Sequence, residues 1–197
     1  SVYGGGVTAF NSNGFSVGSW GAVNLSSNTY VGWCWKGIGN SSTSSVTNTA
    51  GSITGGSQVR ANPSAGFSIV TWSVGTAVNN STIGHGLNAA PSFIICKTRT
   101  ASNQNWIVYH KNLGTGDYLA LESTQGSDTR FSTIWGTSAP TSTVFGVGLS
   151  GYSNNTSSNN YVAYCFSPVS GYSSFGSYVG NGSSDGVFVW TGFKPRF

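Results

Sequence analysis

The sequence is poor in charge, and above all in acidic residues. Only 6% of its 197 residues are Asp, Glu, Lys or Arg, the acids number four, and methionine is absent. Surface helices of soluble proteins are usually rich in Glu, Lys, Ala and Leu. The scarcity of this mixture argues against an all-α or an α/β architecture.

Long apolar runs are missing as well. The apolar runs, such as Phe93 to Cys96, are far shorter than the roughly 20 residues that a membrane-spanning helix needs. The sequence also does not open with the basic and then apolar pattern of a signal peptide. We therefore expect no membrane insertion.

The basic residues and the cysteines form no binding pattern. The net charge is +4, but the eight Lys and Arg residues are scattered, so there is no basic stripe to neutralise several phosphates. The three cysteines, Cys34, Cys96 and Cys165, each stand in an apolar run, and none has the spacing of a zinc ligand. We expect no nucleic-acid partner, no metal and no cofactor, and we interpret the cysteines as small buried thiols.

What the sequence does contain is turn-forming residues and aromatics. Gly (29), Ser (34), Thr (20) and Asn (18) make up about half of the chain, and 7 Trp, 9 Tyr and 11 Phe provide surface to bury. Strand-like runs alternate with turn-rich spacers, which is typical of an all-β protein, an antiparallel β-sandwich or a jelly-roll-like fold. The predicted strands are 14–18, 29–35, 67–72, 92–98, 105–110, 118–121, 130–135, 143–147, 161–166 and 187–190.

Parts of the sequence recur at a separation of about 120–131 residues. The segment NTYVGWCW at 28–35 resembles NYVAYCF at 160–166, and GFSIVT at 66–71 resembles GVFVWT at 186–191. The matches keep both faces of each strand, as the alternation of side chains in a strand requires. We interpret 1–65 as the latter half of a preceding repeat plus a Ser/Thr/Asn-rich linker, 66–185 as the main sandwich repeat, and 186–197 as the start of a following repeat or a closing strand.

The repeat also suggests how the chain relates to its parent protein. A sequence without methionine that stops where its earlier copy enters a strand is expected to be part of a longer repetitive protein. A single sandwich assembled from all the strands is the alternative. An intact mass of 20.4 kDa for the natural protein would contradict the first interpretation.

Residues for catalysis are few. The acids Asp117, Glu122, Asp128 and Asp185 lie among turn residues, where solvation or turn capping explains them better than paired acid and base chemistry. His85 and His110 are the only imidazole bases, and no nucleophile-elbow or phosphate-loop motif accompanies them. We therefore predict that the protein is not an enzyme and has no catalytic residues.

Aromatic residues are the candidate binding groups. Trp and Tyr combine an apolar face with a polar tip, which suits sugar rings, and Trp106, Tyr109 and Trp135 lie in or beside turn-rich stretches. These three are our candidate glycan contacts. A place in the core or in a subunit interface is the competing interpretation for each of them.

The motifs resemble those of one known family. They include IGHGL at 83–87, APSFII at 90–95, NWIVYH at 105–110, YVAYCF at 161–166 and TGF at 191–193. Together they resemble a domain that is repeated in tail-fibre-like and other virion proteins of marine tailed bacteriophages, including cyanophages. The resemblance covers nearly the whole chain. It implies a role at the virion surface or in host contact, and it brings no catalytic residues.

These observations lead to one expectation with two alternatives. We expect a bacteriophage virion structural protein, a tail-fibre or surface-decoration module that binds copies of itself and other virion proteins and contacts a host glycan. The first alternative is a subunit of a bacterial extracellular filament or surface adhesin, at the cell surface or secreted. The second is a secreted carbohydrate-active enzyme, for which substitution of Glu122 or Asp128 would abolish glycan cleavage.

Overall fold

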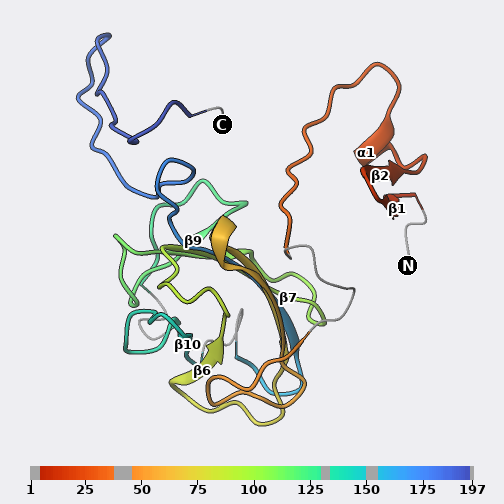
Figure 1. Cartoon of the computed structure of the whole chain (residues 1–197), viewed down its shortest axis with the longest axis vertical. Helices are drawn as coiled ribbons and strands as arrows, with labels where there is room; N and C mark the ends of the chain where they lie inside the picture. The colour runs from red at the N-terminus through yellow and green to blue at the C-terminus, as the bar shows by residue number, and fades with distance from the viewer. Residues whose placement is uncertain (1–4, 38–45, 130–133, 150–154, 196–197) are drawn as a thin grey trace. The chain divides into compact units, whose positions relative to one another are not determined.

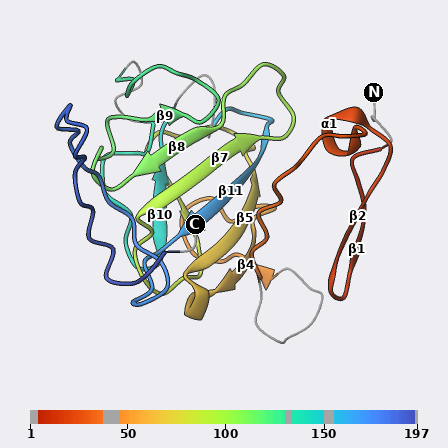
Figure 2. The same cartoon turned by 90° about the horizontal axis from the view of Figure 1, so that it is seen from above.

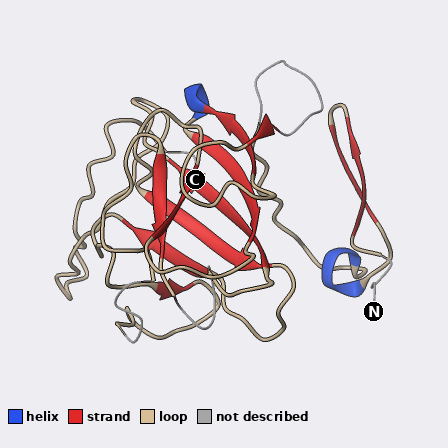
Figure 3. Ribbon diagram, turned by 90° about the horizontal axis from the view of Figure 1, so that it is seen from below, coloured by secondary structure: helices blue, strands red, loops and turns tan. Residues whose placement is uncertain are grey.

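A computed structural model describes residues 5–37, 46–129, 134–149 and 155–195 of the chain. The chain divides into two compact units, Ser1–Trp35 and Lys36–Phe197, here called the N-terminal unit and the sandwich unit. The ribbon drawings show both (Figures 1 and 3). In the part of the chain that is described, no helix is long and apolar enough to cross a membrane.

The sandwich unit is built on an antiparallel sheet of seven strands, in the order β3-β4-β5-β11-β7-β8-β9. Figure 2 shows β11 lying between β5 and β7. The strands are β3 (Val46–Thr47), β4 (Gln58–Asn62), β5 (Phe67–Ser73), β7 (Phe93–Thr98), β8 (Ile107–His110), β9 (Leu119–Ala120) and β11 (Asn160–Phe166). A single 3-10 turn, η1 (Pro63–Ala65), connects β4 to β5.

A second, two-stranded sheet covers one face of the large sheet. It pairs β6 (Ser81–Gly84) with β10 (Val144–Val147), and Phe145 lies opposite Ile83 in that pair. Trp72 of β5 stacks on Tyr161 of β11 with ring centroids 5.3 Å apart and meets the edge of Phe145 at 6.0 Å. The core therefore lies between the two sheets, and its aromatics come from both of them.

The N-terminal unit is a hairpin followed by a short helical turn. The hairpin pairs β1 (Val7–Asn11) with β2 (Gly14–Val17), and α1 (Gly21–Asn24) follows. The Tyr30 hydroxyl accepts a hydrogen bond from the Leu25 amide at 2.9 Å and donates one to the Gly21 carbonyl at 2.8 Å. Residues 28–37 form no strand, although they have the sequence of one.

The all-β class and the antiparallel sandwich are confirmed, with α1 and η1 the only helical turns among the described residues. Two predicted strands, 29–35 and 187–190, are irregular, and part of a third, 130–135, lies outside the described residues. A strand needs a neighbour for its backbone groups, and within this chain β11 and β5 already pair with each other. The internal repeat stays a prediction.

The division between the units differs from the sequence-based boundary at residue 65. Strands β3 and β4 continue the large sheet next to β5, so the residues from 46 onward belong structurally to the sandwich. The compact units divide after Trp35 instead. The polar β4 was not among the predicted strands, because its sequence QVRAN offers few apolar residues.

Candidate glycan-contact face

The outer face of the large sheet carries a small aromatic platform, formed by Trp106, Tyr164 and Lys97. The rings of Trp106 and Tyr164 stack with centroids 6.3 Å apart, and the Lys97 ammonium lies 5.5 Å from the Trp106 ring centre. All three side chains are half-buried. A partly exposed indole beside a cation is suited to stack on a sugar ring.

A phenylalanine cluster lies on the same face, at one end of β5, β11 and β7. Phe166 is its centre, with ring centroids 5.0 Å from Phe67, 5.7 Å from Phe93 and 6.2 Å from Phe175. The side-chain amide of Asn112 donates a hydrogen bond to the Ser177 hydroxyl at 2.6 Å, and this bond holds the segment after Phe175 near the sheet. This end of the outer face is thus covered by the chain itself.

Two of the three candidate glycan contacts are core residues. Tyr109 and Trp135 are 3% and 1% exposed, and their rings pack edge to face with centroids 5.8 Å apart. A sugar cannot reach either ring without unfolding the core, so the assignment is wrong for these two and stays a prediction for Trp106. The alternation of side chains along a strand explains why Trp106 and Tyr109 differ. The two residues are three positions apart, so they project from opposite faces of the sheet.

The acids near the platform have structural partners. Both carboxylate oxygens of Glu122 accept from the Trp106 amide at 3.1 Å, which fixes the backbone that presents the indole. Asp128 accepts from the Tyr118 hydroxyl at 3.2 Å and also pairs with Tyr118 through its backbone. Each acid therefore stabilises a turn or a bridge beside the sheet.

His85 is completely buried, and both of its ring nitrogens are used. Its Nδ1 accepts from the Leu87 amide at 3.2 Å, and its Nε2 lies 3.1 Å from the Thr141 carbonyl oxygen. These partners select the neutral tautomer with the proton on Nε2. Burial lowers the pKa of His85, an effect that the Thr141 carbonyl partly opposes. A second proton would have to displace the Leu87 amide from Nδ1.

This geometry predicts an acid-sensitive fold. The folded pKa of His85 lies below its unfolded value of about 6.5, so its stabilising contribution is complete above that pH and is lost as the pH falls through the folded pKa. In His85→Gln, the free energy of unfolding should fall less steeply as the pH is lowered below about 6.5, as measured by urea titration. The pKa of His110 is also lowered by burial, but less of its surface is enclosed.

His110→Gln is the matched control for His85→Gln. This variant should keep most of the wild-type slope, because His110 is only half-buried at the end of β8. Equal slopes in wild type and His85→Gln would show that His85 is not the titrating group.

Two of the three cysteines are buried in the sandwich and one is exposed. Burial raises the pKa of Cys165 to about 12, and burial together with the neighbouring Cys165 raises that of Cys96 well above its ordinary value. Both thiols therefore stay protonated and unreactive. The prediction of a buried thiol holds for these two and is wrong for Cys34, which is exposed in the irregular segment 28–37.

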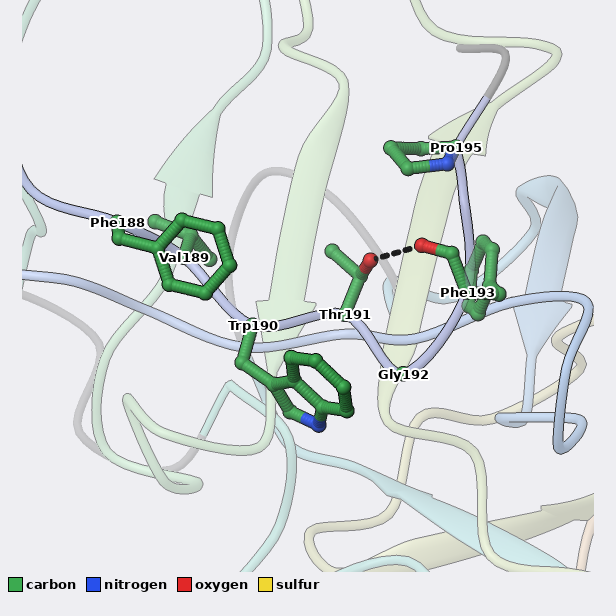
Figure 4. A pocket seen from close by; sticks show the side chains of 7 residues that line it. All are labelled: Phe188, Val189, Trp190, Thr191, Gly192, Phe193 and Pro195. Atoms are coloured by element: carbon green, nitrogen blue, oxygen red, sulfur yellow. Dashed lines mark hydrogen bonds between the residues drawn. The ribbon is translucent and has the colours of Figure 1, made fainter.

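The C-terminal segment encloses a shallow hollow of its own, shown in Figure 4. Its walls come from one stretch of chain, 188–195, which bends where the Thr191 hydroxyl donates to the Phe193 carbonyl at 2.6 Å. Phe188 and Trp190 are 83% and 79% exposed. Such a hollow exposes apolar surface, and the Thr191 hydroxyl and the Phe193 carbonyl are bonded to each other (Figure 4).

Comparison with known proteins gives one match. The model of a family described as a domain of unknown function, DUF7483, matches residues 2–197. No curated protein and no solved structure matches the chain. Within the described ranges, no group of three or more His, Cys, Asp or Glu residues could hold a metal ion.

Proposed function

We propose that this chain, which belongs to the DUF7483 family, is a self-associating structural module of a bacteriophage virion, in a tail fibre or on the particle surface. The sequence resemblance to virion proteins of marine tailed phages supports the location. The fold supports a role in assembly, because a sandwich with a complete core is flanked by irregular segments rich in apolar side chains.

The single observation that carries the proposal is the exposure of those side chains. Outside the sandwich core, Val31 is 82% exposed, Trp33 62%, Phe188 83% and Trp190 79%. Exposed apolar surface of this kind marks an interaction site in a soluble protein. A charge-poor surface adds little repulsion between copies, since only 6% of the residues are charged.

The experiment that tests the location is antibody labelling of purified phage particles in the electron microscope. Gold particles on the fibres, the baseplate or the capsid surface are the expected result. Absence of label from all three, with the protein detected in the host cell envelope instead, would reject the proposal in favour of a bacterial surface protein.

A glycan contact at the platform is the second part of the proposal. Replacing Trp106 by Ala removes the half-buried indole, which is not part of the buried core cluster. We expect at least a tenfold weaker affinity, about 1.4 kcal/mol, for surface polysaccharide purified from the host bacterium. Tyr172→Ala, which removes an aromatic ring that is 61% exposed elsewhere on the chain, should bind like wild type. Equal binding by the Trp106 variant would reject this face as the contact.

A further inference from the structure

The two exposed apolar segments are related in sequence to two strands that pair with each other in the sandwich. Residues 30–35, YVGWCW, correspond to 161–166 of β11, and 186–191, GVFVWT, correspond to 66–71, which cover most of β5. In the large sheet, β11 and β5 are antiparallel neighbours, with Cys165 opposite Ser68 and Ala163 opposite Val70. The chain thus contains a second candidate pair of these strands, and both members are irregular.

We propose that 30–35 of one copy of this chain pairs with 187–191 of a second copy as an antiparallel strand pair, in the register that β11 and β5 use. Transferring that register gives five facing pairs. They are Val31 with Thr191, Gly32 with Trp190, Trp33 with Val189, Cys34 with Phe188, and Trp35 with Val187.

Side-chain size supports this register. On the face that corresponds to the sandwich core, the largest side chains of one segment meet the smallest of the other, Trp190 on Gly32 and Phe188 on Cys34. On the other face, Trp33 and Trp35 meet Val189 and Val187, and pairs of aromatic with β-branched residues stabilise antiparallel strands. A shift by one residue would place Trp190 against Trp33 or Val31 and lose this match.

The order of the segments along the chain selects a second copy as the partner. In the sandwich, the chain passes through β5 before it reaches β11. The flanking segments occur in the opposite order, with the β11-like segment before the sandwich and the β5-like segment after it. The order of β5 before β11 is restored when the β5-like segment at the end of one copy meets the β11-like segment at the beginning of the next copy. Such head-to-tail contacts build a linear array, or a ring when the rotation between successive copies closes.

The inference deepens the self-association in the proposed function, and the isolated chain is sufficient to test it. Because Cys34 lies opposite Phe188 in the proposed pair, Phe188→Cys would bring two thiols to facing positions of antiparallel strands. Facing Cα atoms there are about 4.5–5.5 Å apart, which suits a disulfide. Cys96 and Cys165 are buried and protonated, so oxidation with diamide selects the two exposed thiols.

We expect oxidised Phe188→Cys to form a ladder of dimers and higher species on a non-reducing gel, far above the level in wild type. Mass spectrometry should find the peptide of Cys34 joined to the peptide of position 188. Val189→Cys is the matched control, because the side chain at position 189 projects to the opposite face of the proposed pair. The yield of disulfide-linked species from this variant should be at least tenfold lower. A mixture of wild type with the double variant Cys34→Ser/Phe188→Cys should give only dimers through this link.

Three results would overturn the inference. The first is a yield of disulfide-linked species from Phe188→Cys that is no higher than that of wild type. The second is an equal yield of these species from Val189→Cys. The third is a disulfide of Cys34 that lies within single chains instead of between chains. Because the gel does not depend on the virion, its failure can be told apart from a failure of antibody labelling on phage particles.

Discussion

Trp72→Ala is expected to lower the free energy of unfolding by about 3–5 kcal/mol. The indole is 1% exposed, stacks on Tyr161 and meets Phe145 of the opposite sheet, so its removal leaves a cavity where the two sheets join. Because typical domains are stable by only about 5–15 kcal/mol, the loss takes a large share of the total. We expect the thermal midpoint to fall by roughly 10 °C, as measured by circular dichroism.

Trp190→Ala makes the same chemical change on an indole that is 79% exposed. In dilute solution its stability should stay within about 0.5 kcal/mol of wild type. A comparable loss in both variants would mean that Trp190 is packed in the isolated chain, and no loss in Trp72→Ala would contradict a core between the two sheets.

Gly66→Ala is expected to cost about 2–4 kcal/mol, the second largest effect. Gly66 ends η1 in the left-handed region, with φ +62°, and an added Cβ would collide with the Ser167 carbonyl oxygen and lie 2.8 Å from Val169 Cγ2. The left-handed backbone costs about 1 kcal/mol for a residue with a Cβ, and the collision adds about 1–3 kcal/mol. Denaturant titration measures the sum.

Gly171→Ala separates the two contributions to that cost. Gly171 has a similar φ of +73°, but no atom lies within 4 Å of its Cβ position, so only the backbone cost of about 1 kcal/mol should appear. Equal losses in the two variants would show that the chain after β11 does not pack against Gly66.

The sequence predicts the central strands well because their pattern and their burial agree. In 161–166, Tyr161, Ala163 and Cys165 alternate with outward-facing residues, and the structure buries all three. The strand at 93–98 follows the same rule. Strands β4 and β6 were missed because QVRAN and STIG hold few apolar residues, and their place depends on pairing with β5 and β10, which is not a local property.

The same local pattern overpredicts strands in two segments. Residues 29–35 and 187–190 have strand-like sequences, yet neither is a strand in this chain. An alternating apolar pattern indicates which side chains a segment can bury. A strand also requires a neighbouring strand that forms hydrogen bonds with its backbone N–H and C=O groups. The mismatch is the physical basis for placing a second copy beside these segments.

The candidate site was only partly predictable. Turn-rich surroundings suggested exposure for Trp106, Tyr109 and Trp135 alike, but the structure buries the last two. The alternation between Trp106 and Tyr109 held enough information to separate these two, whereas the burial of Trp135 depends on packing against Tyr109 from a distant part of the chain. The pairing of Trp106 with Lys97 and Tyr164 could not be foreseen either, because it needs the order of β8, β7 and β11 in the sheet.

The central claim is that a complete sandwich carries two strand-like segments that other copies of the chain complete. Hydrogen exchange of the intact chain, followed by mass spectrometry at low and at high protein concentration, tests it most directly. We predict that β5, β7 and β11 are protected at both concentrations, and that 30–35 and 187–191 exchange rapidly in dilute solution and become protected together as the concentration rises. Rapid exchange of the two segments at every concentration, or equal protection of all strands in a strictly monomeric chain, would contradict the claim.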